Sequence, residues 1–200
     1  MAKQAESGEI PLSDLLREIR RCRHCAESLP LGPNPVLRAS SRARMVIVGQ
    51  APGTRVHESG IPWDDPSGNR LRQWLDVDPD TFYDERRIAI IPMGFCYPGR
   101  GSSGDLPPRP ECAELWHKRL FAKLPNLQLK LLLGQYSQAC YLGKRRKKTL
   151  TATVQAYREY VPELLPLPHP SPRNTLWLKR NPWFEAKVVP LLRDLVAPLL

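Results

Sequence analysis

Five cysteines are the residues of this chain best suited to binding a metal. Cys22 and Cys25 form a C-x2-C pair, and Cys96 and Cys112 follow much later in the sequence. Such a pair places two thiolates within reach of one metal centre, and two further cysteines on a loop would complete four ligands for zinc or an iron–sulfur cluster. The alternative is four unrelated thiols. Cys140 lies in the apolar helical stretch GQYSQACYL, where we expect it only to pack.

The segment PLPHPSPRN, residues 166–174, is a second candidate for chemistry. Prolines on both sides of His169 restrict its backbone, so its ring can be aimed, and a neutral imidazole can donate a hydrogen bond to a developing oxyanion. The alternative is a structural histidine. The side chains that follow could bind phosphate oxygens or reach between the strands of a duplex. These candidate DNA-binding residues are Ser171, Pro172, Arg173 and Asn174.

Two earlier segments, GQAPG at residues 49–53 and WDDPSG at residues 63–68, could bind a planar ligand. Glycines let backbone N–H groups approach a ligand closely and proline stiffens a turn, although an ordinary strand-to-helix turn has a similar sequence. Trp63 could stack on a ring or belong to the core, and Asp65 could act as a carboxylate or only cap a helix. The candidate base-binding residues are Gly49, Gln50, Ala51, Pro52, Gly53 and Trp63.

The net charge of +10 and the pI of about 9.7 favour a polyanionic partner, most simply nucleic acid. The densest basic run is either a solvated loop or a phosphate-binding surface. It consists of Lys144, Arg145, Arg146, Lys147 and Lys148. The sequence shows no apolar run of transmembrane length and no secretory signal, so we expect a cytoplasmic monomer with one domain over residues 1–200.

Short apolar, β-branched runs alternate with helical patterns along the chain. We expect strands at residues 45–48, 88–91, 129–133 and 163–167, and helices at 12–19, 67–75, 111–124, 135–142 and 182–195. This alternation predicts an α/β fold with a mainly parallel sheet, in which ligands bind at the carboxyl ends of the strands. The peptides at 49–53, 92–96 and 169–174 each follow a predicted strand, so they should form one site.

GQAPG, residues 60–68 and HPSPRN together resemble the uracil-DNA glycosylase superfamily, and the cysteine spacing resembles its iron–sulfur-containing branches, families four and five. The resemblance runs from about Cys22 to Asn174. It implies a three-layer α/β/α domain with a central four-stranded parallel sheet. It also favours a [4Fe–4S] cluster over zinc, with the ligands Cys22, Cys25, Cys96 and Cys112.

The chain departs from the pattern of this family at three positions. Many members carry an acidic residue in the first motif, where this chain has Gln50 and Ala51. Some branches place the aspartate in a later Asp-x-Ser-Gly segment, which matches Asp65 here. The iron–sulfur family with the strictest uracil preference has an asparagine at the position of Pro92, so the resemblance does not identify the base.

We therefore expect a monofunctional DNA glycosylase that excises a flipped uracil or another deaminated or modified base. Trp63 would stack on the base, the backbone of residues 50–53 would bind its polar edge, and His169 would stabilise the departing base. Asp65 would balance the oxocarbenium-like sugar and orient water. Two alternatives are a non-catalytic DNA- or base-binding module of the same fold, favoured by Ala51, and a zinc-stabilised nucleic-acid hydrolase.

Overall fold

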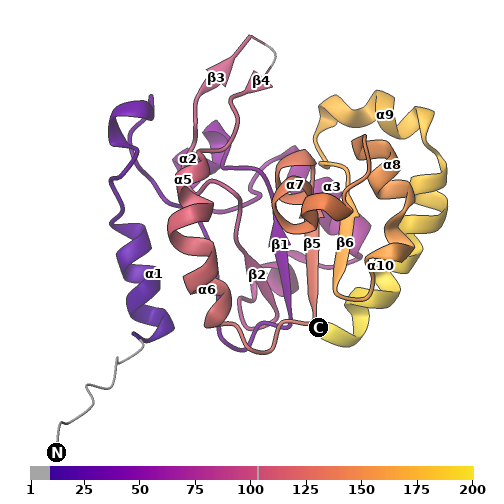
Figure 1. Cartoon of the computed structure of the whole chain (residues 1–200), viewed down its shortest axis with the longest axis horizontal. Coiled ribbons are helices and arrows are strands. Elements are labelled where there is room, and N and C mark those ends of the chain that lie inside the picture. Colours follow the sequence, from indigo (N-terminus) through magenta and orange to yellow (C-terminus); the bar gives the residue numbers. More distant parts are fainter. Residues whose placement is uncertain (1–9, 103) are drawn as a thin grey trace, which may run out of the picture.

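The centre of the molecule is a four-stranded sheet in the order β2-β1-β5-β6, with every neighbouring pair parallel. The computed structural model describes residues 10–102 and 104–200. The strands are β1 (Met45–Val48), β2 (Ile88–Ile90), β5 (Leu129–Leu133) and β6 (Leu164–Leu167). Each lies within one residue of its predicted bounds, and helices cover both faces of the sheet (Figure 1). The predicted three-layer α/β/α architecture is confirmed.

Alternate residues of each strand contribute to separate cores on the two faces of the sheet. Met45 and Ile47 of β1 belong to one buried cluster, while Val46 and Val48 belong to the other. Because both faces are buried, the strands have nearly continuous apolar sequences, as is usual for parallel sheets.

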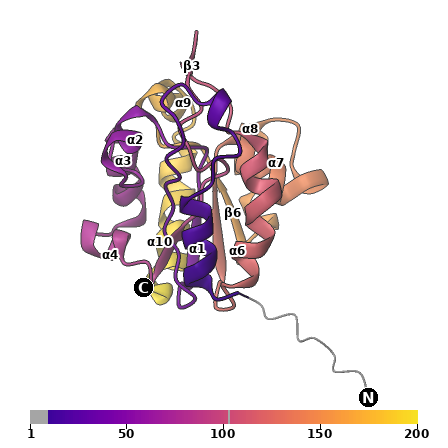
Figure 2. The same cartoon turned by 90° about the vertical axis from the view of Figure 1, so that its left-hand side faces the viewer.

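One face is covered by α1 (Leu12–Arg20), α6 (Lys118–Ala122) and α7 (Gln135–Leu142), whose apolar side chains enter the second cluster. Figure 2 shows α6 and α7 on one side of the sheet and α3 and α4 on the other. The Arg119 guanidinium of α6 donates to the Glu18 carboxylate of α1 at 2.7 Å, which joins two helices of the same layer.

The other face is covered by α3 (Pro66–Leu75), α4 (Pro79–Tyr83), α8 (Leu150–Gln155) and α10 (Val189–Val196). The buried residues Leu71, Trp74 and Leu75 anchor α3 on the sheet. The remaining helices are α2 (Thr54–Ser59), α5 (Pro110–Cys112) and α9 (Thr175–Arg180). A two-stranded hairpin of β3 (Arg100–Gly101) and β4 (Gly104–Asp105) projects beyond the carboxyl edge of the sheet (Figure 1).

Short 3-10 and π turns complete the fold. The 3-10 turns are η1 (Ala26–Ser28), η3 (Gly143–Arg145), η4 (Tyr157–Glu159), η5 (Pro172–Asn174) and η7 (Ala197–Leu199). The π turns are η2 (Ala113–His117) and η6 (Phe184–Val188). These two turns occupy the middle of the predicted helix at 111–124 and the first part of the one at 182–195, so both of those helical segments contain a wider turn.

Cys140 does not have the predicted packing role. The side chain lies on α7 but is exposed, because this helix buries a different set of residues, among them Gln138 and Leu142. The prediction was wrong because α7 is only weakly amphipathic, so its sequence did not define the buried face.

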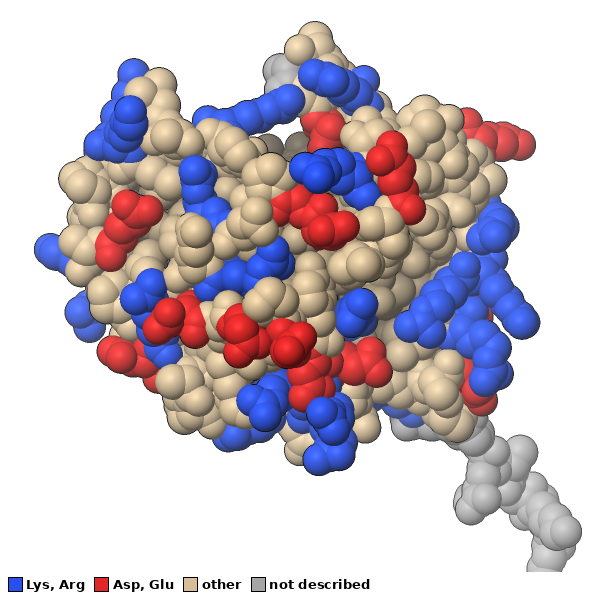
Figure 3. Space-filling view, turned by 180° about the vertical axis from the view of Figure 1, so that it is seen from behind, with Lys and Arg blue, Asp and Glu red and all other residues tan. Residues whose placement is uncertain are grey.

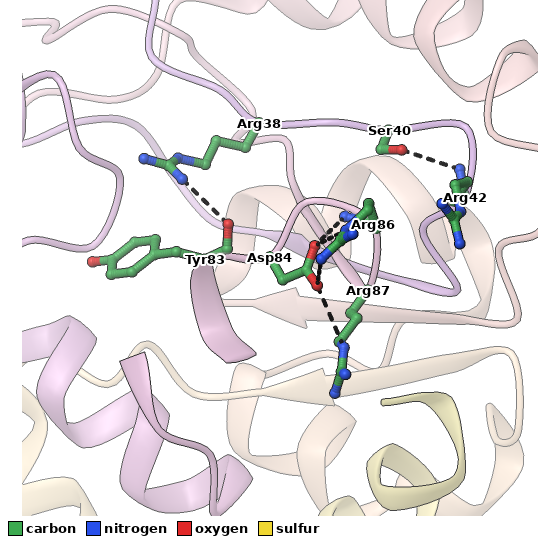
Figure 4. Close-up of polar contacts among 7 residues, drawn as sticks. All are labelled: Arg38, Ser40, Arg42, Tyr83, Asp84, Arg86 and Arg87. Atoms are coloured by element: carbon green, nitrogen blue, oxygen red, sulfur yellow. Dashed lines mark hydrogen bonds and ion pairs between the residues drawn. The ribbon is translucent and has the colours of Figure 1, made fainter. Parts of the chain in front are cut away.

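A cluster of arginines fixes the turn that leads into β2 (Figure 4). The Asp84 carboxylate accepts hydrogen bonds from Arg86 at 2.8 and 2.9 Å and forms an ion pair with Arg87 at 3.4 Å. The bonds from Arg86 lower the pKa of Asp84 to about 2. Arg38 pairs through its backbone with Ile90 at the end of β2 and donates to the Tyr83 carbonyl at 3.2 Å.

Within the described part of the chain, no helix combines the length and apolar character needed to cross a bilayer.

Candidate active site

A cavity of about 410 Å³ lies at the carboxyl edge of the parallel sheet, where the loops after β1, β2 and β6 meet. Figure 3 shows a hollow below the projecting hairpin, with Lys and Arg side chains close to it. Most of the residues singled out from the sequence as base-binding, catalytic or DNA-binding line this cavity. They are Gly49, Gln50, Ala51, Pro52, Gly53, Trp63, Asp65, His169, Ser171, Arg173 and Asn174. Pro172 belongs to the same loop as the last three but does not line the cavity.

The loop after β6 fixes both the orientation and the tautomer of His169. The backbone N–H of Ser171 donates to Nδ1 of the ring at 3.2 Å, and the Asn174 side-chain amide donates to the His169 carbonyl at 2.7 Å. Because a backbone N–H can only donate, Nδ1 must be the acceptor, and the neutral ring carries its hydrogen on Nε2. Burial lowers the pKa of His169 to about 4, against an opposing effect of the Asp65 carboxylate. At neutral pH the ring is therefore an uncharged hydrogen-bond donor through Nε2.

Asp65 caps α3 and also acts electrostatically inside the cavity. Its Oδ1 atom accepts a hydrogen bond from the Gly68 backbone N–H at 2.8 Å, and Pro66 takes the first position of the helix, where no N–H is needed. This cap uses one of the two carboxylate oxygens. The effect of Asp65 on the pKa of His169 shows that its charge reaches the imidazole. The helix cap and a functional carboxylate are thus compatible in one residue.

Trp63 occupies a backbone conformation that is rare for a residue with a side chain. Its φ is 61°, and its ring lies 5.4 Å from that of His169, at an interplanar angle of 31°. A Cβ atom at Gly49 would come within 2.8 Å of Cζ2 of Trp63, and one at Gly68 would overlap the Trp63 carbonyl oxygen. Both glycines are therefore required by the position of this tryptophan. Strained backbone of this kind is concentrated at functional sites.

The GQAPG loop is attached to the loop that follows β2. The Gly49 carbonyl accepts from the Met93 N–H at 3.0 Å, and the Gln50 carbonyl accepts from the Gly94 N–H at 2.9 Å. The Gln50 side-chain amide donates to the Leu106 carbonyl at 3.3 Å. The two loops are thus joined into one wall of the cavity, and the Gln50 amide connects this wall to the chain beyond the hairpin.

A buried histidine that the sequence did not single out supports the same wall. Nε2 of His117 lies 3.0 Å from the Pro92 carbonyl, and Nδ1 lies 2.6 Å from the Tyr141 hydroxyl. A carbonyl can only accept, so Nε2 carries the hydrogen and the Tyr141 hydroxyl donates to Nδ1. Burial lowers the pKa of His117 to about 4, which keeps the ring neutral. His117 thereby fixes Pro92, which lines the larger cavity.

The projecting hairpin also contributes to the cavity, which the sequence analysis did not anticipate. Gly104 and Asp105 line it, and the Oδ2 atom of Asp105 lies 3.6 Å from the position that a Cβ of Gly53 would take. The Arg173 guanidinium packs on Gly104, whose φ of 143° is a backbone conformation that residues with a side chain rarely adopt. The glycine- and serine-rich sequence GRGSSGD is the signal that could have indicated a hairpin.

The basic run is not part of the cavity wall. The Lys147 ammonium forms an ion pair with Glu159, and the Arg145 guanidinium donates to the Glu159 carbonyl at 3.1 Å. The Tyr160 hydroxyl donates to the Arg145 carbonyl at 2.8 Å. Glu159 and Tyr160 lie between α8 and β6. Lys144, Arg146 and Lys148 are exposed, and a role of the run in phosphate binding stays a prediction.

The four cysteines with metal-ligand spacing line one small cavity of about 20 Å³, while Cys140 does not. The Phe95 backbone N–H donates to Sγ of Cys112 at 3.4 Å, and Nε1 of Trp116, another residue of this cavity, is buried with no hydrogen-bond partner among the described residues. Burial raises the pKa of Cys96 to about 11 and that of Cys112 to about 12. Across residues 10–102 and 104–200, no three His, Cys, Asp or Glu side chains are arranged to hold a single metal ion.

Fold and site together define an α/β domain with a cavity beyond the carboxyl ends of a parallel sheet, lined by a tryptophan, a carboxylate and a neutral histidine. The family model described as Uracil DNA glycosylase superfamily matches residues 38–193. The chain belongs to this superfamily. The matched range contains the lining of the larger cavity except Val36, and it begins after Cys22 and Cys25, so the match does not cover that cysteine pair.

Proposed function

We propose that this protein is a monofunctional DNA glycosylase that removes uracil or another deaminated or modified base from DNA by hydrolysis of the N-glycosidic bond. The observation that carries the proposal is the neutral His169, whose Nε2–H donor shares one cavity with the Asp65 carboxylate and the Trp63 ring. The cavity volume of about 410 Å³ lies in the usual range for small-ligand pockets, about 300–1,000 Å³. A base inside a duplex cannot reach such a pocket, so the nucleotide must be flipped out.

The departing base is stabilised by His169. When the bond between C1′ of the sugar and the base nitrogen breaks, the electron pair leaves with the base, whose negative charge is delocalised onto a carbonyl oxygen. Nε2–H of His169 donates to that oxygen. A neutral donor that is already oriented by the Ser171 N–H stabilises this charge without rearrangement.

Asp65 acts on the other half of the breaking bond. The sugar becomes an oxocarbenium-like cation, which the Asp65 carboxylate stabilises by its charge. Water then attacks C1′ and loses a proton to the carboxylate or to solvent, and the base anion takes up a proton from solvent, which leaves a neutral free base and an abasic site. No covalent enzyme intermediate is needed, because so reactive a cation is captured by water.

The chemistry of His169 is compatible with a deaminated base as the substrate. Deamination replaces an exocyclic amine with a carbonyl, and a carbonyl is the group to which an Nε2–H donor can bind. Trp63 would stack on the base, and the backbone of residues 50–53 would bind its polar edge. Pro92 offers no side-chain donor or acceptor for base reading, which supports a preference broader than uracil alone.

DNA contacts are proposed for the loop after β6 and for the basic run. Arg173 lies at the cavity rim against the hairpin, where it could take the place of a flipped nucleotide. Ser171 and Asn174 already use side-chain atoms inside their own loop, so their contribution to phosphate binding is secondary to shaping that loop. The exposed members of residues 144–148 would add sequence-independent affinity.

A [4Fe–4S] cluster is proposed at Cys22, Cys25, Cys96 and Cys112, with zinc as the less favoured alternative. The residues present suit the cluster, because four thiols surround one apolar cavity that is also lined by Trp116, whose buried N–H has no hydrogen-bond partner among the described residues and could donate to sulfur. In a four-iron cluster each thiolate binds a different iron, so the four need not converge on one point as they would around zinc. Such a cluster would supply a structural tie between the N-terminal cysteine pair and the loop after β2.

A panel of duplexes that each contain one altered base tests the proposed activity. Incubation with the protein followed by alkali should cut the labelled strand at one or more of these bases, because abasic sites are alkali-labile. Omission of alkali should leave the strand intact, which distinguishes a monofunctional glycosylase from a nuclease. Binding to the duplexes without any alkali-labile product would refute catalysis and favour the non-catalytic DNA- or base-binding module.

A further inference from the structure

Arg70, on the second turn of α3, connects the two candidate catalytic segments. Its Nη1 atom donates to the Ser171 carbonyl at 3.0 Å and lies 3.4 Å from the Pro170 carbonyl. Its Nη2 atom donates to Oγ1 of Thr175 at 3.3 Å. One guanidinium therefore contacts Pro170 and Ser171 of the loop that follows His169, and Thr175 at the start of α9. Arginine suits this task because its rigid fork of donors can serve several acceptors at once, whereas lysine offers a single point charge.

The helix that carries Arg70 is the helix that Asp65 caps. Its inner face is anchored on the sheet by Leu71, Trp74 and Leu75, which are at most 4% exposed. The position of the Asp65 carboxylate is thus set by a rigid helix, and the hydrogen bonds from Arg70 attach the His169 loop to the same helix.

The loop has further hydrogen bonds, but these serve a different purpose. The Ser171 N–H bond to the imidazole and the Asn174 amide bond to the His169 carbonyl both run within the loop and define its shape. The bonds from Arg70 run to an element about 100 residues away in the sequence and so define where the loop sits.

We propose that Arg70 is a positioning residue that fixes the His169 imidazole relative to the Asp65 carboxylate. This inference rests on the proposed function, since it assigns Arg70 a task in the same site. Arg70 acts through the loop backbone. The Pro170 carbonyl that Arg70 contacts belongs to the same peptide group as the Ser171 N–H, so loss of Arg70 should allow this peptide group to shift and weaken the N–H bond that selects the Nε2–H tautomer.

The test compares Arg70→Gln and Arg70→Lys with a matched control, Arg193→Gln. Arg193 also donates to backbone carbonyls of α3, those of Gln73 and Trp74 at 2.9 and 3.2 Å, but at the end of the helix far from the cavity. Single-turnover excision should slow by about 10- to 100-fold in Arg70→Gln, as is typical of small misplacements of catalytic groups, and less in Arg70→Lys. Arg193→Gln should excise at nearly the wild-type rate, and duplex affinity should change little in all three.

Long-range ¹H–¹⁵N spectra of the His169 ring at pH 7 give a readout that does not depend on activity. The wild-type ring should show a protonated Nε2 and an acceptor Nδ1, and Arg70→Gln should show a mixture of tautomers. Unchanged His169 signals in Arg70→Gln would overturn the proposal, with or without a loss of rate. An equal loss of rate in Arg193→Gln would also overturn it, since general destabilisation would then explain both. Absence of excision by the wild-type protein would refute the proposed function, while the spectra would still decide the role of Arg70.

Discussion

Replacement of Asp65 by asparagine separates the two functions that this residue combines. The cap is the 2.8 Å hydrogen bond from the Gly68 N–H to Oδ1. Asparagine caps helices as well as aspartate does, so Asp65→Asn should leave the free energy of unfolding nearly unchanged. Asp65→Ala should lose the cap, at a cost of about 1 kcal/mol, which corresponds to a decrease in Tm of about 2–4 °C for a chain of this size.

The same substitution should strongly slow base excision. A full positive charge on the sugar about 4 Å from the carboxylate would interact with it by about 4 kcal/mol at an effective dielectric constant of about 20. The transition state carries only part of that charge, so about 2–4 kcal/mol is lost with the carboxylate. This corresponds to a decrease of roughly 30- to 1,000-fold in the rate of the chemical step. Asparagine and alanine should therefore have similar rates and different melting temperatures.

The assay is single-turnover excision of the best base at saturating protein, together with melting curves. Asp64→Asn is the matched control, because Asp64 is the exposed neighbour, does not line the cavity and undergoes the same chemical change. An independent check is the pKa of His169, which the Asp65 carboxylate raises and which should therefore fall in Asp65→Asn. Excision by Asp65→Asn at the wild-type rate would refute the reasoning and reduce Asp65 to a helix cap.

Three further predictions concern pH, the cysteine site and the basic run. Because the pKa of His169 is lowered to about 4, the unfolded chain binds more protons than the folded one between pH 4 and 6.5, so this residue makes stability increase with pH across that window. Because His169 stays neutral above this lowered pKa, it should cause no inflection of the excision rate near pH 6.5, and the pH profile in that region should have the same shape in His169→Ala. The variant itself should excise the base about 10²- to 10³-fold more slowly. Cys96→Ala should lose the iron and its broad absorbance near about 400 nm and should have a lower Tm, whereas Cys140→Ala should change neither. Unchanged iron content in Cys96→Ala would contradict the ligand assignment. Neutralisation of Lys144, Arg146 and Lys148 should weaken binding to all duplexes and flatten the salt dependence of that binding, while the single-turnover rate stays unchanged. An unaltered salt slope would show that the run is only a solvated loop.

The fold was predictable because its strands are short apolar runs separated by helical patterns, and the parallel arrangement follows from that alternation. The position of the cavity followed in turn, since the ends of parallel strands meet at one edge. Gly49, Asp65 and His169 could thus be assigned to one site although they are distant in sequence.

The residues that hold the site in place were not predictable from the sequence, because their roles depend on contacts between distant elements. His117, at the end of η2, bonds to a carbonyl 25 residues earlier in the chain, and Arg70 looks like an ordinary polar residue in the helical pattern of α3. The positive φ of Trp63 has no signature in its own residue type. It becomes apparent only from Gly49 and Gly68, whose missing side chains make room for it.

The identity of the released product tests the central claim most directly. A duplex with a single uracil or other deaminated base is incubated with the wild-type protein at pH 7, and the small molecules are analysed by mass spectrometry. The account predicts the intact free base in a 1:1 ratio with abasic sites, with the phosphate backbone uncut, and a greatly reduced yield at early times from Asp65→Asn and His169→Ala. Release of a nucleoside or nucleotide, or no release from any altered base in the panel, would contradict it.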